Sequence, residues 1–68
     1  MKDVKEARIK KGLTQVELAE QIGISQSAIS EIESGDLRPS TSVLVRLADV
    51  LDLDLDGLVR AAVALSAN

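Results

Sequence analysis

Apolar residues recur at intervals of three and four in five stretches of the chain, and this spacing is typical of amphipathic helices. The first predicted helix covers about 2–11 and stops at Gly12, because glycine commonly follows the last turn of a helix. The fourth covers about 41–51 and the fifth about 55–65. The pattern therefore predicts an all-α fold, with five helices in one domain over residues 1–68.

The link between the fourth and fifth helices alternates acidic and apolar residues as DLDLD, from Asp52 to Asp56. Alternation over five residues is also the pattern of a short strand. We expect a non-helical link instead, with Asp54 as the N-cap of the fifth helix, because every neighbouring segment is helical. The three carboxylates of this link do not match the twelve-residue calcium-loop pattern, so no metal site is expected here.

The segment from about 14 to 34 contains a helix start, a helix stop and a second start in close succession. The letters TQVE form a capping box, in which the Thr14 hydroxyl accepts from a backbone N–H and Glu17 reaches back. We expect Gly23 to end this helix in the left-handed conformation, and Ser25 to cap the next one. Two helices joined by a short turn that contains glycine form a helix-turn-helix.

The stretch ARIKKGLTQVELAEQIGISQSAISEIESG, followed by RPSTSVLVRLADVLDLDLDGLV, resembles the Xre-type helix-turn-helix family, which includes Cro and the lambdoid phage repressors. The resemblance spans roughly Val4 to Val59. Counted from Gln15, seven positions fit the family's motif: Leu18, Ala19, Ile22, Gly23, Ile24, Ile29 and Ile32. The resemblance implies a five-helix, repressor-like domain that regulates transcription by binding a palindromic operator as a homodimer. It also implies that the third helix, about 25–34, enters the major groove of double-stranded DNA.

The outer face of the third helix would then contact base edges through Gln26, Ser27, Ser30 and Glu31. A glutamine amide can bond N6 and N7 of adenine, a serine hydroxyl can bond several bases, and a glutamate can accept from N4 of cytosine. The alternative for this face is plain solvation. For Glu31 a second alternative is the repulsion of phosphates in wrong complexes.

Contacts to the DNA backbone are expected from Gln15, Lys10, Lys11, Arg38 and Ser34. Gln15 stands in the first turn of the second helix, where free N–H groups and the positive end of the helix dipole attract phosphate. Lys10 and Lys11 are expected to flank the same DNA-facing surface as Gln15. In related proteins the loop after the third helix lies along the DNA backbone, which favours Arg38. The alternative for each lysine is a charge that only faces solvent.

One arginine and one glutamate fall on inward positions. Arg8 lies on the inner stripe of the first helix, and Glu33 stands beside Ile32 on the third. Related repressors pair an arginine and a glutamate at matching positions. The resemblance therefore implies a structural ion pair between Arg8 and Glu33, which fixes how the first helix meets the motif.

The fifth helix carries more apolar residues than one small domain needs. We assign closure of the core to Leu55, Leu58 and Val59. Val63 and Leu65 follow the point where the resemblance fades, and we expect them to make the homodimer contacts.

Composition narrows the choice of function. The 68 residues include no histidine and no cysteine, and they contain no glycine-rich phosphate loop. We therefore do not expect an enzyme, a metal site or a bound cofactor. No segment approaches the roughly 20 apolar residues of a membrane span, and no apolar run follows the N-terminal charges. We therefore expect a cytoplasmic protein without a signal peptide.

The net charge of −3 is unevenly distributed. Residues 1–12 hold five Lys/Arg and two acids, residues 13–35 hold four acids and no base, and residues 36–68 hold three bases and five acids. An acidic total disfavours strong non-specific binding to nucleic acid. It leaves open a second function, in which the same fold is a protein-interaction module such as an antitoxin or a transcriptional co-activator.

Overall fold

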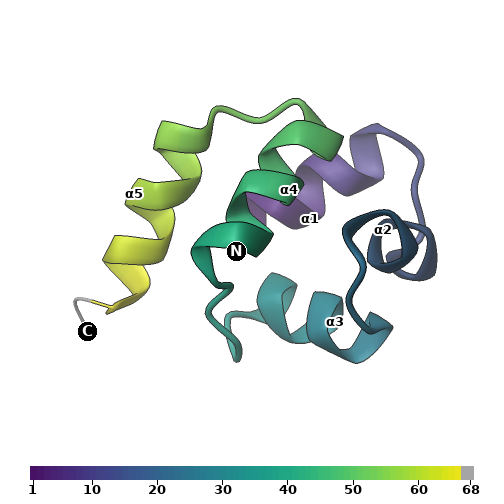
Figure 1. The fold of residues 1–68 in the computed structure, drawn as a ribbon, viewed down its shortest axis with the longest axis horizontal. Helices are drawn as coiled ribbons and strands as arrows, with labels where there is room; N and C mark the ends of the chain where they lie inside the picture. Colours follow the sequence, from purple (N-terminus) through teal and green to yellow (C-terminus); the bar gives the residue numbers. More distant parts are fainter. Residues whose placement is uncertain (67–68) are drawn as a thin grey trace.

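The computed structural model describes residues 1–66, and the side chains of residues 61, 62 and 64–66 lie outside that description. Five helices occupy the described part (Figure 1): α1 (Lys2–Lys10), α2 (Gln15–Ile22), α3 (Gln26–Ser34), α4 (Thr41–Leu51) and α5 (Leu55–Ser66). This confirms the all-α, five-helix fold predicted from the pattern. Among the described residues, no helix combines the length and the apolar character that crossing a membrane requires.

Local contacts fix the start of α2, and a glycine and a capping serine shape the turn between α2 and α3. The Thr14 hydroxyl accepts from the backbone N–H of Glu17 at 3.0 Å, and the Glu17 carboxylate accepts from the N–H of Thr14 at 2.9 Å. The predicted capping box is therefore confirmed. Gly23 ends α2 in the left-handed region with φ +88°, and the Ser25 hydroxyl accepts from the N–H of Ala28 at 3.1 Å.

The link between α4 and α5 is not a strand. Asp52 ends α4 with φ +53°, a left-handed conformation that aspartate adopts more readily than most residues. The Asp54 carboxylate accepts from the backbone N–H of Asp56 at 3.2 Å, which confirms Asp54 as the N-terminal cap of α5. One left-handed residue and one short-range hydrogen bond thus shape the link between the last two helices.

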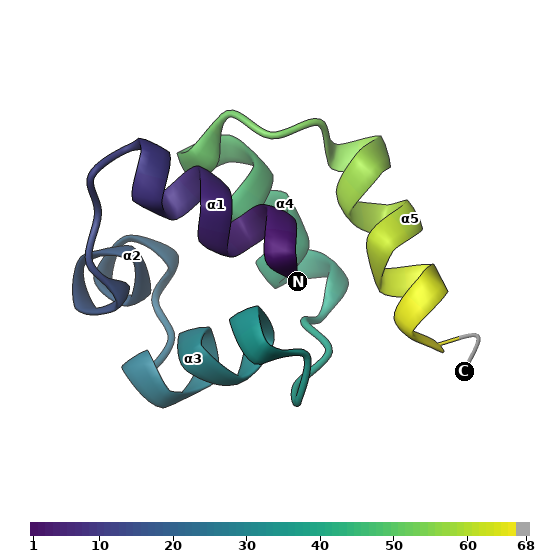
Figure 2. The same ribbon diagram turned by 180° about the vertical axis from the view of Figure 1, so that it is seen from behind.

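The core is built from aliphatic side chains of all five helices. In both views α2 and α5 lie on opposite sides of the α1 and α4 pair, and α3 runs along one end (Figures 1 and 2). Helix α2 packs on α3 and α4, and α5 packs on α4. The most deeply buried side chains are Val4, Leu18, Ile22, Ile29, Ile32, Leu47 and Leu58. Because α3 contributes Ile29 and Ile32 to this core, its opposite face is left to solvent.

The assignment of Leu55 and Val59 to the core is wrong. Leu58 is buried with 2% of its surface exposed, whereas Leu55 and Val59 each leave 41% exposed. Successive residues of a helix are rotated by about 100°, so Leu55 and Val59 lie together on a face beside that of Leu58. Leu58 supplies the buried contact, and the neighbouring face of α5 remains open.

The start of the chain is held at the end of α3. Met1 is buried, and its amino nitrogen donates to the carbonyl oxygens of Ile32 at 2.6 Å and Glu33 at 3.2 Å. The last carbonyls of a helix have no partner within the helix, and a positive charge there is favourable. This contact joins the first turn of α1 to the last turn of α3.

Candidate nucleic-acid interface

Helix α3 presents a polar face to solvent. Its nine residues span about 13 Å, with Ile29, Ile32 and Glu33 buried on one side. The four side chains predicted to contact bases all lie on exposed positions: Gln26, Ser27, Ser30 and Glu31. They bring an amide, two hydroxyls and a carboxylate onto one exposed helix, which is the chemistry that reads base edges in the major groove.

The buried face of α3 ends in a carboxylate that three helices share. Arg8 of α1 donates twice to Glu33, from Nε to Oε2 at 2.6 Å and from Nη2 to Oε1 at 3.1 Å. Its third nitrogen, Nη1, donates to the carbonyl oxygen of Leu13 at 2.8 Å. Gln15 of α2 donates from Nε2 to Glu33 Oε1 at 3.2 Å. The side chains of Arg8 and Glu33 are only 12% and 3% exposed, so this contact is screened from solvent.

The electrostatics of this contact keep both partners charged. Burial raises the pKa of Glu33, but hydrogen bonds from Arg8 and Gln15 and the nearby positive charges lower it by more. The pKa of Glu33 therefore lies below its ordinary value. The hydrogen bond to Glu33 raises the pKa of Arg8, against a smaller lowering by burial.

The Gln15 side chain, from which a DNA-backbone contact is expected, already makes a hydrogen bond inside the protein. The side chain is half-buried, and one of its amide N–H groups is directed at Glu33. The backbone N–H groups in the first turn of α2 have no acceptor inside the helix. Any phosphate contact at this point therefore depends on the backbone of α2 as much as on the Gln15 amide.

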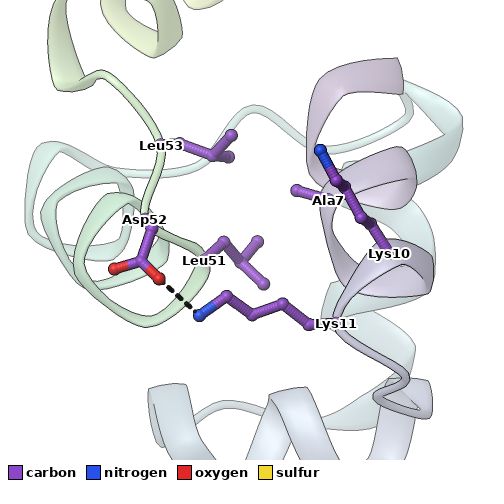
Figure 3. Close-up of a pocket in the computed structure, with 6 residues that line it drawn as sticks. All are labelled: Ala7, Lys10, Lys11, Leu51, Asp52 and Leu53. Atoms are coloured by element: carbon purple, nitrogen blue, oxygen red, sulfur yellow. Dashed lines mark hydrogen bonds and ion pairs between the residues drawn. The ribbon is translucent and has the colours of Figure 1, made fainter.

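Lys10 and Lys11 are not brought to the α3 face. They line a hollow of about 420 Å³ between the end of α1 and the end of α4, together with Ala7, Leu51, Asp52 and Leu53 (Figure 3). The Lys11 ammonium lies 2.6 Å from the Asp52 carboxylate, and this ion pair crosses from α1 to α4. Figures 1 and 2 place the C-terminal end of α1 at the top of the molecule and α3 at the bottom.

Ser34 and Arg38 lie at the other end of α3. The Ser34 hydroxyl is 3.1 Å from the carbonyl oxygen of Glu31 and 2.9 Å from the Asp36 carboxylate, so it stabilises the loop that follows the helix. Arg38 is exposed in that loop, next to the buried Pro39. Arg38 follows the last residue of α3 by four positions, and its contact with phosphate stays a prediction.

The predicted homodimer residues lie on α5, away from α3. Val63 leaves 60% of its surface exposed. The side chain of Leu65 lies outside the described residues. Leu55, Val59 and Val63 follow each other at intervals of four, so they form one exposed apolar stripe along α5.

Sequence reasoning missed Arg46, which reaches from α4 to the end of α2. Its Nη1 donates to the carbonyl oxygen of Ile22 at 3.0 Å. The sequence offers only a weak signal: α2 has no basic residue in its last turn, where a positive charge is favourable. The partner could not be located from the sequence, since Arg46 and Ile22 are 24 residues apart.

The helix-turn-helix family profile matches residues 4–58, which is most of the chain. The chain belongs to the helix-turn-helix family. A 10 kDa protein of the ImmF control region of Bacillus phage phi105 is 42% identical over 55 residues, which cover 81% of this chain and 61% of that protein. An uncharacterized HTH-type transcriptional regulator of Bacillus subtilis, YazB, is 44% identical over 48 residues, which cover 71% of this chain and 70% of that protein.

A phage repressor is also among the relatives of this helix-turn-helix chain. The cryptic phage CTXphi transcriptional repressor RstR of Vibrio cholerae is 40% identical over 45 residues, which cover 66% of this chain and 40% of the repressor. The match with the phi105 protein takes in 61% of that protein, and a match with YqaE of Bacillus subtilis takes in 50% of it. The chain thus spans between 40% and 70% of the length of the relatives named here.

Proposed function

We propose that this helix-turn-helix chain is a sequence-specific transcriptional regulator that binds a palindromic operator as a homodimer, with α3 in the major groove. The main support for this proposal is the exposed polar face of α3. The opposite face of α3 is buried and holds the helix in place. The relatives described as transcriptional regulators and as a repressor support it.

Base reading is assigned to Gln26, Ser27, Ser30 and Glu31, and Gln26 is the leading candidate. Gln26 is the first residue of α3, so its side chain is at the end of the helix that enters the groove in helix-turn-helix proteins. Its amide offers both a donor and an acceptor, which match N7 and N6 of adenine. Arg38, Ser34 and the first turn of α2 are assigned to the DNA backbone.

We assign the homodimer interface to the apolar stripe on α5, which consists of Leu55, Val59 and Val63. Leu65, further along the same helix, is assigned to the same interface. An operator with two-fold symmetry mirrors a two-fold dimer, and two copies of α3 must enter successive major grooves on one face of the duplex. The half-site centres are therefore expected about 34 Å apart.

The test is selection of binding sites from random duplex DNA, followed by titration of variants. Gln26→Ala should weaken binding to the selected operator by about 2–6 kcal/mol, because one contact worth roughly 1–3 kcal/mol is lost in each half-site. Binding to scrambled DNA should barely change, since Gln26 neutralises no phosphate. Gln21→Ala is the matched control, because Gln21 is an exposed glutamine on α2. If Gln26→Ala loses the same affinity for the operator and for scrambled DNA, Gln26 does not read bases.

A second candidate function is a protein-interaction module on the same fold. The acidic surface of the motif favours it, since Glu17, Glu20, Glu31 and Asp36 are all exposed and no Lys or Arg occurs in residues 13–35. A partner for this surface would be basic. Selection that enriches no DNA sequence, together with α3 variants that weaken a complex with a basic protein, would favour this function.

A further inference from the structure

We infer that Arg46 of α4 is a positioning residue for base reading, because it holds the end of α2 from which the chain enters α3. The inference rests on the proposed function. Arg46 Nη1 donates to the carbonyl oxygen of Ile22 at 3.0 Å, and this hydrogen bond is partly buried. Ile22 is the last residue of α2, so the bond joins α4 to the turn of the helix-turn-helix.

The end of α2 receives a cation from outside the helix. The backbone N–H groups of Gly23 and Ile24 both donate to the carbonyl oxygen of Ala19, at 2.8 and 3.1 Å, and so close the last turn. They do not serve Ile22, whose carbonyl oxygen accepts from Arg46. The guanidinium also places positive charge at the negative end of the α2 dipole, where α2 itself has no basic residue.

The turn is too short to absorb a movement of Ile22. Gly23 is fixed at φ +88°, and Ser25 already caps α3 in an extended conformation. A Cβ built on Gly23 would lie 3.7 Å from Arg46 Nη1, so the guanidinium lies close to the turn. Moving the end of α2 relative to α4 therefore moves the first residues of α3.

The two ends of α3 are held by different contacts. The end of α3 at Glu33 is fixed by Arg8 and by the amino group of Met1. The beginning of α3 carries Gln26 and Ser27, and the Arg46 contact restrains the turn that leads into it. Loss of the Arg46 contact is therefore expected to displace the base-reading end of α3 while the other end stays in place.

The experiment compares Arg46→Met, which keeps an unbranched stem without charge, with Arg46→Lys, which keeps the charge. Arg60→Met is the matched control, because Arg60 is an exposed arginine that pairs with Asp56 on its own helix. Affinity is measured for the selected operator and for scrambled duplex at one salt concentration. Arg46→Met should lose about tenfold or more on the operator and far less on scrambled DNA, with helical circular dichroism retained. Arg46→Lys should recover part of the loss, and Arg60→Met should show none.

Amide hydrogen exchange tests the same contact without DNA. Exchange at Gly23 and Ile24 should accelerate in Arg46→Met and remain at the wild-type rate in Arg60→Met.

Unchanged amide exchange in Arg46→Met, or a wild-type ratio of operator affinity to scrambled-DNA affinity, would overturn the inference. Equal losses on both DNAs would also overturn it, because they would make Arg46 a phosphate contact. If Arg46→Met does not fold, Arg46→Lys decides: a reduced affinity ratio supports positioning and a wild-type ratio contradicts it. If the wild type enriches no operator, the proposed function fails, and hydrogen exchange still tests Arg46.

Discussion

Arg8 of α1 and Glu33 of α3 meet through two hydrogen bonds, at 2.6 and 3.1 Å, in a part of the structure that solvent scarcely reaches. A planar guanidinium suits this geometry because its N–H groups match the two oxygens of a carboxylate. Gln15 of α2 donates to the same carboxylate. One side chain of α3 is therefore bonded to both preceding helices, and the orientation of α3 depends on it.

Removing the arginine should leave a buried charge without its partner. Arg8→Ala is expected to lower the free energy of unfolding by about 3–5 kcal/mol, measured by urea denaturation. The double variant Arg8→Met/Glu33→Leu is the control. It removes both charges and should recover much of the loss, since an apolar pair can replace a buried ion pair. A melting temperature of Arg8→Ala within a few degrees of wild type would contradict the expected importance of the pair.

Stability should depend on pH through the same carboxylate. The pKa of Glu33 is lower in the folded state than in the unfolded state. The stabilisation that Glu33 gives to the fold is therefore fully present above its unfolded-state pKa of about 4.3, and it is lost as pH falls through its folded-state pKa. Urea midpoints between pH 7 and pH 2 should therefore decline mainly below about pH 4. Glu33→Gln should flatten this decline in part, because Glu17, whose pKa is lowered chiefly by the backbone N–H of Thr14, still titrates there. An unchanged pH profile in Glu33→Gln would argue against this assignment.

Two glycines should respond oppositely to the same substitution. Gly23→Ala forces a side chain into φ +88° and should cost about 1–2 kcal/mol of stability. Gly57→Ala, inside α5, should instead stabilise by up to about 1 kcal/mol, since its Cβ would meet only the Asp54 side chain at 3.7 Å. Thermal unfolding of both variants checks this. Equal effects at the two positions would mean that the left-handed turn is not what makes Gly23 necessary.

Charges placed on α5 should separate a dimer without unfolding its subunits. Val59→Lys/Val63→Lys replaces residues that are 41% and 60% exposed, so helical circular dichroism should be preserved while sedimentation shifts toward the monomer. Val45→Lys is the matched control, because Val45 is 47% exposed on α4. If the double variant sediments like wild type, the apolar stripe is not the interface.

Helix boundaries were the most predictable part of this fold, because each depends on residues close in sequence. Thr14 and Glu17 are three positions apart, and Asp54 lies two positions from the N–H that it caps. Gly23 could likewise be recognised as a helix stop from the serine that follows two residues later. Such contacts form within one turn of chain and require no knowledge of the tertiary arrangement.

Contacts between distant segments could not be predicted in this way. The Lys11–Asp52 ion pair joins residues 41 positions apart and directs Lys11 away from α3. The hydrogen bond from Gln15 to Glu33 bridges 18 positions. Both depend on how helices pack, which the apolar pattern of one helix does not specify. The Arg8–Glu33 contact spans 25 positions, and only the resemblance to related repressors predicts it.

Four exposed side chains of α3 contribute neither to the buried core nor to the caps that end the helix, and this separation has a consequence for inheritance. Substitutions at exposed positions usually change stability by no more than about 0.5 kcal/mol. Under the proposed function, Gln26, Ser27, Ser30 and Glu31 can therefore vary between generations without putting the fold at risk. Descendants of one such chain could come to control different genes while keeping the same helices, the same turn and the same buried ion pair.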